Sequence, residues 1–200
     1  MKKCAIFGAS GHGKVIGEIA ELNFFQCYFF DDNLSENVEI EGNKNDLIND
    51  IGSFDNVIVA IGDNETRKKI YAEFEAKSAK MNALVHPNSV IGKNVELGAG
   101  TVVMAGVVIN PGCRIGKSSI INTKSIIDHD CLLGDFVHIS PGTMLAGNVT
   151  VGSDSWLGLG SKIINNIAIG EKVIIGAGST VTKNVIDHDK VVGTPAKSIK

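Results

Sequence analysis

His129, in the second half of the chain, stands between two acidic residues, in the run Asp128-His129-Asp130. An imidazole titrates near neutral pH, so it can take a proton from an attacking nucleophile. Either neighbouring carboxylate could hold one tautomer of the ring and stabilise its cation. Gly147 comes later in the same half of the chain, and a glycine N–H beside such a base could donate to an oxyanion. These groups fit acyl transfer, provided that the fold places them side by side.

A glycine-rich turn follows the first apolar segment and consists of Gly8, Ala9, Ser10, Gly11, His12 and Gly13. Between a strand and a helix, such a turn points backbone N–H groups at a bound phosphate. A tight turn without a ligand is the alternative. Asp31 and Asp32 come about 20 residues later, where an acidic residue contacts nucleotide hydroxyl groups in dinucleotide-binding folds. A simple strand-terminating turn would also explain this acidic pair.

A second polar turn, Gly62-Asp63-Asn64, comes at the end of another apolar segment and opens a helix with an acidic first turn. Gly62 and Asn64 are candidate nucleotide contacts at this turn. Arg67, within that helix, could face a phosphate or could pair with helical Glu residues. A region of about 80 residues offers one mononucleotide half-site rather than two, which argues against NAD.

The elements that must carry these turns alternate between strand and helix. Apolar runs predict strands over residues 4–7, 27–30 and 56–61, and helices over residues 15–22 and 66–77. This alternation predicts a small parallel sheet, that is, a truncated Rossmann-like α/β domain over residues 1–85.

The second half of the chain is an uninterrupted hexapeptide repeat. Sixteen consecutive positions at this spacing are Ile, Leu or Val: Ile91, Leu97, Val103, Ile109, Ile115, Ile121, Ile127, Leu133, Ile139, Leu145, Val151, Leu157, Ile163, Ile169, Ile175 and Val181. The fourth position after each is nearly always small or β-branched. One hexapeptide holds a short strand and a corner, and three such sides close a triangular coil. Residues 86–200 are therefore predicted to form an all-β domain, a left-handed parallel β-helix of about five coils.

In such a coil, any residue lies directly above the one that follows it by three hexapeptides, at a separation of about 4.8 Å. His129 and Gly147 have this spacing, so His129 is predicted to lie directly beside Gly147. His138 follows His129 by half a coil, so the two histidines would meet only across the interface of a three-fold assembly. A corner histidine flanked by aspartates could also be an ordinary solvated residue.

The composition excludes several classes of function. The net charge is −3 and no cluster of Lys and Arg is interleaved with aromatic residues, which argues against nucleic acid as a partner. No apolar run is long enough to predict a membrane span, so we expect a cytoplasmic protein. The four cysteines are far apart and are expected to be reduced thiols. No metal is expected, because zinc sites of γ-type carbonic anhydrases use three histidines on this fold and only His129 and His138 lie within the repeats proper.

One pattern is formed by GASGHG near the start, FFDD, AIGDNETRKKI, LVHPNSVIG, NTKSIIDHDCLLGDFVHISPGTMLAGNVTVG and VVGTPAK. Over essentially the whole chain, this pattern resembles the sugar acetyltransferases of the sialic-acid O-acetyltransferase type. It is most similar to those that act on UDP-4-amino-sugars in bacillosamine-type glycan synthesis. The resemblance implies a homotrimer, with acetyl-CoA in clefts between adjacent β-helices and the nucleotide-sugar bound by the N-terminal domain.

The resemblance also implies roles for individual residues. The catalytic base of the family matches His129, and its partner acid, usually Glu, falls on Asp130, whose side chain is one methylene shorter. The oxyanion donor would be the N–H of Gly147. Three further positions match substrate-binding residues of the family: His12, Asn122 and His138. Later coils would line the path of pantetheine and adenine around Gly158, Ile175 and Lys183.

The activity expected from these features is N-acetylation of the 4-amino group of a UDP-linked deoxy-sugar by direct attack. A covalent acyl-enzyme is not expected, because Cys131 occupies an inward-facing repeat position. O-acetylation of sialic acid or a related sugar would use the same groups. A non-catalytic trimeric β-helix that only binds nucleotide-sugars is an alternative of another class.

Overall fold

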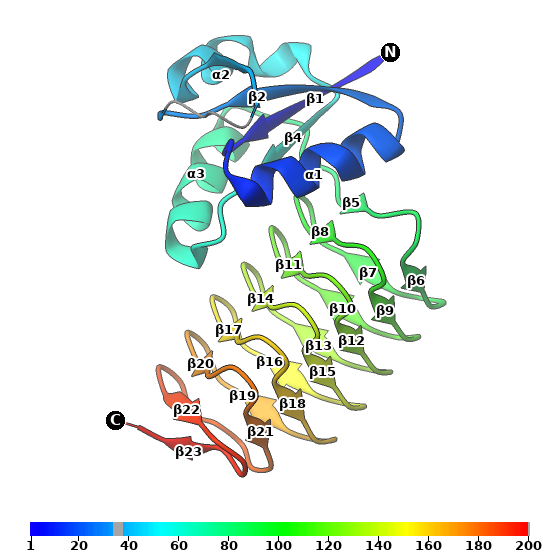
Figure 1. The fold of residues 1–200 in the computed structure, drawn as a ribbon, viewed down its shortest axis with the longest axis vertical. Helices are drawn as coiled ribbons and strands as arrows, with labels where there is room; N and C mark the ends of the chain where they lie inside the picture. Colours follow the sequence, from blue (N-terminus) through cyan, green and yellow to red (C-terminus); the bar gives the residue numbers. More distant parts are fainter. Residues whose placement is uncertain (34–37, 200) are drawn as a thin grey trace.

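The computed structural model describes residues 1–33 and 38–199 and shows two parts arranged along the longest axis of the molecule (Figure 1). A small α/β part, coloured blue to cyan, contains the N-terminus. A parallel β-helix, coloured green to red, extends away from it and ends near the C-terminus. The predicted fold class is therefore confirmed.

The α/β part is built on a parallel sheet with the strand order β3-β2-β1-β4. Its elements are β1 (Lys2–Phe7), α1 (Gly11–Leu22), β2 (Phe25–Phe30), β3 (Ile40–Gly42), α2 (Lys44–Asp50), the short 3-10 helix η1 (Ile51–Ser53), β4 (Asn56–Val59) and α3 (Asn64–Ala76). The three predicted strands and two predicted helices are all present. α1 begins at Gly11 rather than at residue 15, because Ser10 already occupies its N-cap.

Three elements of this part were not predicted, namely β3, α2 and η1. The start of α2 nevertheless has a sequence signal. The side chain of Asn43 accepts hydrogen bonds from the backbone N–H groups of Asn45 and Asp46, and the Asp46 carboxylate accepts one from Asn43 N–H. This reciprocal capping box is a known helix start, and the residue types Asn and Asp three apart are visible in the sequence.

The β-helix has three faces. The first face consists of β5 (Leu84–Val85), β8 (Val102–Val103), β11 (Ile120–Ile121), β14 (His138–Ile139), β17 (Trp156–Leu157), β20 (Ile174–Ile175) and β22 (Lys190–Val192), followed by the antiparallel β23 (Lys197–Ser198). The second face consists of β6 (Val90–Ile91), β9 (Val108–Ile109), β12 (Ile126–Ile127), β15 (Met144–Leu145), β18 (Lys162–Ile163) and β21 (Thr180–Val181). The third face consists of β7 (Glu96–Leu97), β10 (Arg114–Ile115), β13 (Leu132–Leu133), β16 (Thr150–Val151) and β19 (Ala168–Ile169).

Strands on each face pair in parallel at a constant offset of three hexapeptides, as Ile120 does with His138. This confirms the predicted coil length. Only the last coil is shorter, since Ile174 pairs with Lys190 rather than with Val192, which the regular repeat would place there. The second face has six strands, so the β-helix has about six coils, one more than predicted. The extra length comes from β5, which precedes the first predicted repeat, and from β22, which follows the last one.

The repeat positions fill the interior as expected. Ile121 and Ile139 are fully buried, and so is Ser119, which is one of the small residues at the second inward position. The first coil is an exception, because Ile91 remains 37% exposed. No coil lies beyond it on its face, and the α/β part covers a different face.

The α/β part sits on the first face of the β-helix, with α1 lying across β5 and β8 (Figure 1). Ile16 and Ile19 of α1 share a buried cluster with Val102 and Ile120, which point outward from β8 and β11. Outward-facing repeat residues that would otherwise meet water are therefore covered. Below His138, from Trp156 onward, the first face has no such cover, since Trp156 is 48% exposed. The junction thus leaves an open surface directly below the α/β part.

Candidate active site

His129 lies directly beside Gly147, as the coil length predicts. It occupies the corner between β12 and β13, and the next coil places Gly147 at the equivalent corner, where Asn148 N–H donates to the His129 carbonyl at 2.9 Å. A Cβ added to Gly147 would lie 2.6 Å from Nε2 of His129. Only glycine leaves room for the imidazole in this position. A ring nitrogen and a main-chain amide group are therefore neighbours on the surface.

The structure distinguishes between the two aspartates that flank His129. Oδ2 of Asp130 lies 2.8 Å from Nδ1 of His129. Asp128 instead accepts hydrogen bonds from the His129 backbone N–H and from the Asn110 side chain. The hydrogen bond with Asp130, followed by the charge of Asp128, raises the pKa of His129 above its ordinary value. Asp130 is therefore the residue that orients the ring. Because Asp130 binds Nδ1, the other ring nitrogen, Nε2, faces Gly147.

A second group of residues lies on the first face, away from His129. The ring of His138 stacks on Trp156, with ring centroids 6.1 Å apart and planes inclined by 18°. Asn122 Nδ2 lies 3.4 Å from His138 Nε2, and the Gly62 backbone lies close enough to the His138 ring to favour its charged form. Burial, followed by the nearby Arg67 cation, lowers the pKa of His138 to about 4. His138 is therefore a neutral hydrogen-bonding group.

His12 belongs to this second group. Burial, then the charge of Arg67, lowers the pKa of His12 to about 4, and His12 is close enough to His138 to lower the pKa of that ring as well. Nε2 of His12 is buried and makes no hydrogen bond within the described part of the chain. An unpaired buried nitrogen of this kind is rare in native proteins and fits a group that meets a ligand.

The glycine turn that carries His12 is tightly packed. Gly8 has a φ of +114°, and a Cβ there would lie 2.6 Å from the Ala60 carbonyl oxygen. A Cβ on Gly13 would collide with the Gly8 carbonyl. Gly11, by contrast, has open space around it, and Ser10 makes no side-chain cap. The packing alone therefore explains Gly8 and Gly13, whereas Ser10 and Gly11 remain available to a ligand.

The two aspartates after β2 hold backbone groups. Asp31 Oδ2 accepts from the Ala9 N–H at 2.8 Å, which ties it to the glycine turn. Asp32 Oδ1 accepts from the Lys44 N–H at 2.9 Å, at the start of α2. Asp31 therefore lies beside the predicted phosphate-binding turn, as the dinucleotide pattern requires, and Asp32 lies one residue farther out on the exposed edge.

Both interpretations of Arg67 are wrong. The side chain is 1% exposed, so it meets neither a phosphate in solvent nor the helical Glu residues. All five of its N–H groups donate instead to protein oxygens at 2.8–3.0 Å: the carbonyls of Ile61, Gly62, Ser118 and Phe136 and the side chain of Asn64. Asn64 is likewise bound to the protein, since its amide donates to the carbonyls of Asp154 and Ser155.

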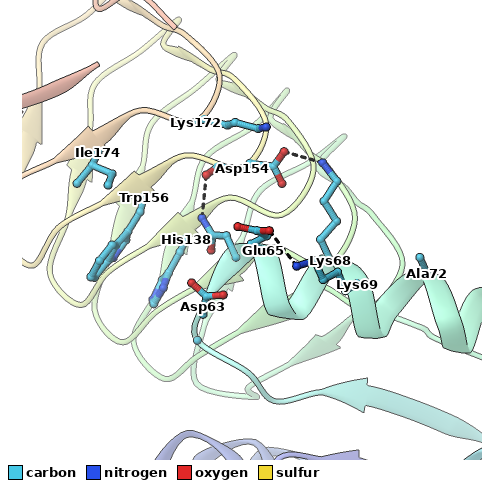
Figure 2. Close-up of a pocket in the computed structure, with 12 residues that line it drawn as sticks. Asp63, Glu65, Lys68, Lys69, Ala72, His138, Asp154, Trp156, Lys172 and Ile174 are labelled. Atoms are coloured by element: carbon cyan, nitrogen blue, oxygen red, sulfur yellow. Dashed lines mark hydrogen bonds and ion pairs between the residues drawn. The ribbon is translucent and has the colours of Figure 1, made fainter. Parts of the chain in front are cut away.

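A cleft of about 1030 Å³ lies between the first turns of α3 and the exposed part of the first face (Figure 2). His138, Trp156 and Ile174 form one wall on β14, β17 and β20, and α3 forms the other. The remaining lining residues are Gly62, Asp63, Asn64, Glu65, Lys68, Lys69, Ala72, Asp154 and Lys172. The cleft thus combines an aromatic surface with charged groups of both signs.

Trp156 and Ile174 were not predicted as site residues. Both were detectable, because they follow His138 at one and two coil lengths and must lie below it on the same face. The lysines on α3 were not detectable in this way, since nothing in the repeat specifies where a helix of the other domain will lie.

The predicted coenzyme path is only partly consistent with the structure. Ile175 is wrong as a side-chain contact, because it is 1% exposed and points into the core. Its carbonyl is occupied by the Gly158 N–H at 2.8 Å. Gly158 lies at the corner after β17, and Lys183 lies at the corner after β21, below His129 and Gly147. The two remaining residues therefore lie on different edges of the β-helix.

Other features of the described residues bear on the chemistry. Among residues 1–33 and 38–199, no group of three or more His, Cys, Asp or Glu side chains is arranged to hold a metal ion. Over the same ranges, no helix has both the length and the apolar character that a membrane span requires. Cys131 is fully buried, so its thiol faces the core and not the His129 corner.

Comparison with known proteins supports an acyltransferase of the hexapeptide-repeat class. The PglD N-terminal domain family matches residues 3–74, and the GMPPB C-terminal domain family matches residues 74–158. The acetyltransferase domain of PglB from Neisseria gonorrhoeae FA1090 is 34% identical, covers 100% of both chains and superposes with a TM-score of 0.95. This domain has also been solved in complex with acetyl coenzyme A.

PerB from Caulobacter crescentus, solved in complex with CoA and GDP-perosamine, is 34% identical over 100% of this chain and 98% of its own, with a TM-score of 0.95. UDP-N-acetylbacillosamine N-acetyltransferase from Bacillus subtilis (strain 168) is 34% identical over 120 residues, which span 52% of each protein. The chain belongs to the family of β-helix sugar N-acetyltransferases that includes the PglB acetyltransferase domain.

Proposed function

We propose that this protein transfers the acetyl group of acetyl-CoA to the 4-amino group of a nucleotide-linked deoxy-sugar, with UDP as the nucleotide. The observation that carries the proposal is the position of Nε2 of His129 directly beside Gly147. The relatives support the substrate class, since one is named for a UDP-linked bacillosamine sugar and another was solved with GDP-perosamine.

His129 acts as the general base in this reaction. Its Nε2 takes a proton from the sugar amine while the amine nitrogen forms a bond to the thioester carbonyl carbon. The oxyanion that develops accepts a hydrogen bond from Gly147 N–H. The carbon–sulfur bond then breaks, coenzyme A leaves as the thiol after taking up a proton, and the amide remains. Asp130 keeps the imidazole in the required tautomer and stabilises its cation.

His12, His138 and Asn122 bind the sugar in this proposal. Because both histidines are neutral at physiological pH, they can accept or donate hydrogen bonds without repelling an amino group. The glycine turn and Asp31 hold the nucleotide. The cleft below His138 receives the remaining parts of the nucleotide-sugar and of acetyl-CoA. Its lysines, Lys68, Lys69 and Lys172, suit phosphate groups.

A homotrimer is part of the proposal, because the two groups of residues lie on different parts of the β-helix. His129 is 58% exposed at the corner between the second and third faces, whereas His138 lies on the first face. The outward residues of the second face are apolar over its first four strands. Val90 and Met144 are 61% and 43% exposed, with Val108 and Ile126 between them. Association through this face would bring His129 of one copy toward His138 of the next.

The test is release of free thiol from acetyl-CoA with UDP-, GDP- and dTDP-linked 4-amino-sugars, and with sialic acid as a hydroxyl acceptor. We expect turnover with the UDP-linked amino sugar and a loss of about 10²- to 10⁴-fold in kcat for His129→Ala. His188→Ala is the matched control. His188 is also exposed and also lies between two aspartates, but its ring does not pack against a glycine as the ring of His129 does against Gly147. Near-normal turnover of His129→Ala would refute the assignment of the base.

A further inference from the structure

Two of the five hydrogen bonds of Arg67 join the two parts of the molecule, and the other three hold residues of the α/β part. The carbonyls of Ser118 and Phe136 belong to equivalent corners of two successive coils, because their positions differ by one coil length. Asn64, which accepts from Arg67, donates to the carbonyl of Asp154, the equivalent corner one coil farther on. Arg67 and Asn64 therefore bind three successive coils through one column of carbonyl oxygens.

The same guanidinium also determines where the Gly62 carbonyl lies. Nη1 donates to the carbonyls of both Ile61 and Gly62 at 3.0 Å. The Gly62 backbone in turn lies beside the ring of His138, close enough to favour the charged form of that ring. A carbonyl has two lone pairs, so the Gly62 oxygen can interact with both side chains. Arg67 is thus connected to the ring of His138 through a single backbone oxygen.

Arg67 is also a cation that acts on both buried histidines. Its charge lowers the pKa of His12 and of His138, in each case as the second cause after burial. The charged groups that face Arg67 itself are Asp63 on its own helix and Asp154 from the β-helix, and both favour its charged form. Burial lowers the pKa of Arg67 only to about 10, so Arg67 remains charged at neutral pH.

We infer that Arg67 is a positioning residue: it fixes the α/β part against the corner of the β-helix and holds the Gly62 carbonyl beside the ring of His138. In doing so, it sets the distance between His12, which comes from the α/β part, and His138, which comes from the β-helix. The inference rests on the proposed function in that these two histidines face the substrate.

Two variants separate the charge of Arg67 from its geometry. Arg67→Lys keeps a cation but has three donors on one nitrogen, so it cannot bind all five oxygens. Arg67→Gln removes the charge and keeps two donors. We expect both variants to lose kcat/KM by about 10²-fold, because a displacement of about 1 Å at a reacting centre has that effect. The matched control is Lys77→Gln, which removes an exposed charge from the C-terminal end of α3.

A second readout does not depend on catalysis. We expect NMR titration of the imidazole groups, assigned with His12→Asn and His138→Asn, to show higher midpoints for His12 and His138 in Arg67→Gln, by about one pH unit or more. In Arg67→Lys these midpoints should stay near those of the unmodified chain, while kcat/KM falls. A purely structural role would lower the thermal stability of the variants without producing this difference between them.

The outcomes of the two experiments can be told apart. If the unmodified chain releases no thiol with any acceptor, the proposed function fails, and the titrations still report on Arg67. If both variants titrate and turn over like the unmodified chain, the inference about Arg67 is overturned. If Arg67→Gln does not fold, Asn64→Asp replaces it, because it keeps an acceptor for Arg67 and removes the donor to Asp154. Unchanged kcat/KM in both Asn64→Asp and Arg67→Lys would then overturn the inference.

Discussion

His129 and Asp130 show how one hydrogen bond sets the working pH of a base. The carboxylate of Asp130 lies 2.8 Å from Nδ1 and raises the pKa of the ring. A general base must be neutral to accept a proton, so kcat/KM should rise with pH and level off above the raised pKa. Below that pKa the ring is protonated and activity is lost.

Replacement of Asp130 by asparagine should move this acid limb to lower pH. The amide removes the negative charge that favours the imidazolium, so the pKa of His129 falls. We also expect a lower plateau, because a weaker base transfers the proton less effectively. The pH dependence of kcat/KM for Asp130→Asn checks this. In Asp130→Glu, the fall of kcat/KM at low pH should return to the pH range of the unmodified chain. An acid limb that does not move would show that Asp130 has no influence on the base.

At the residue scale, the neighbours of His129 could be predicted and those of Arg67 could not. Gly147 lies beside His129 because their separation equals one coil length, which the repeat reveals. The choice between Asp128 and Asp130 needed side-chain geometry. Arg67 was assigned to a phosphate or to Glu partners, and both were wrong, because its acceptors are mostly main-chain carbonyls, two of them from distant parts of the chain. Every residue has a main-chain carbonyl, so the residue types do not show which carbonyls will accept these hydrogen bonds.

At the scale of single strands, the two residues of each short strand have opposite environments. In β13, Leu133 points into the core and is 5% exposed, whereas Leu132 points outward and is 47% exposed. We expect Leu133→Ala to lower the free energy of unfolding by about 2–5 kcal/mol through lost burial and a cavity. Leu132→Ala should cost well under half as much, because most of that surface already meets water.

This pair is its own control, since residue type and strand are the same. Chemical denaturation followed by circular dichroism measures both changes. Equal losses would mean that the inward and outward assignment in β13 is wrong.

The short elements of the α/β part were harder to predict than these strands. β3 and α2 span only Ile40–Gly42 and Lys44–Asp50, which is too short for a periodic pattern to emerge.

At the scale of the whole molecule, the proposed trimer predicts complementation between inactive variants. His129→Ala and His138→Ala should each be inactive alone, if one copy supplies the base and its neighbour supplies the substrate contact. In randomly mixed trimers from co-expression, about a quarter of the interfaces would contain neither defect. We therefore expect the mixture to regain roughly a quarter of the normal turnover.

Thiol release from the mixed preparation, compared with each variant alone, provides the measurement. Analytical ultracentrifugation of the unmodified chain should show a species of three copies. A mixture that stays as inactive as its components would mean that both histidines act within one chain. A variant that is active alone would mean that the histidine it lacks is not needed. Either result would remove the interface from the mechanism.

The spacing of aliphatic residues by itself determined the coil length, the inward and outward positions, and the proximity of His129 to Gly147. In a regular coil, position in space is a periodic function of residue number, so a repeat in the sequence gives the relative position of each residue in the coil. Tertiary structure alone decided how the α/β part docks on the first face, and with it the buried site of Arg67, the meeting of His12 with His138, and the cleft beside Trp156. Docking depends on contacts between segments that share no period, and only the folded chain brings those segments together.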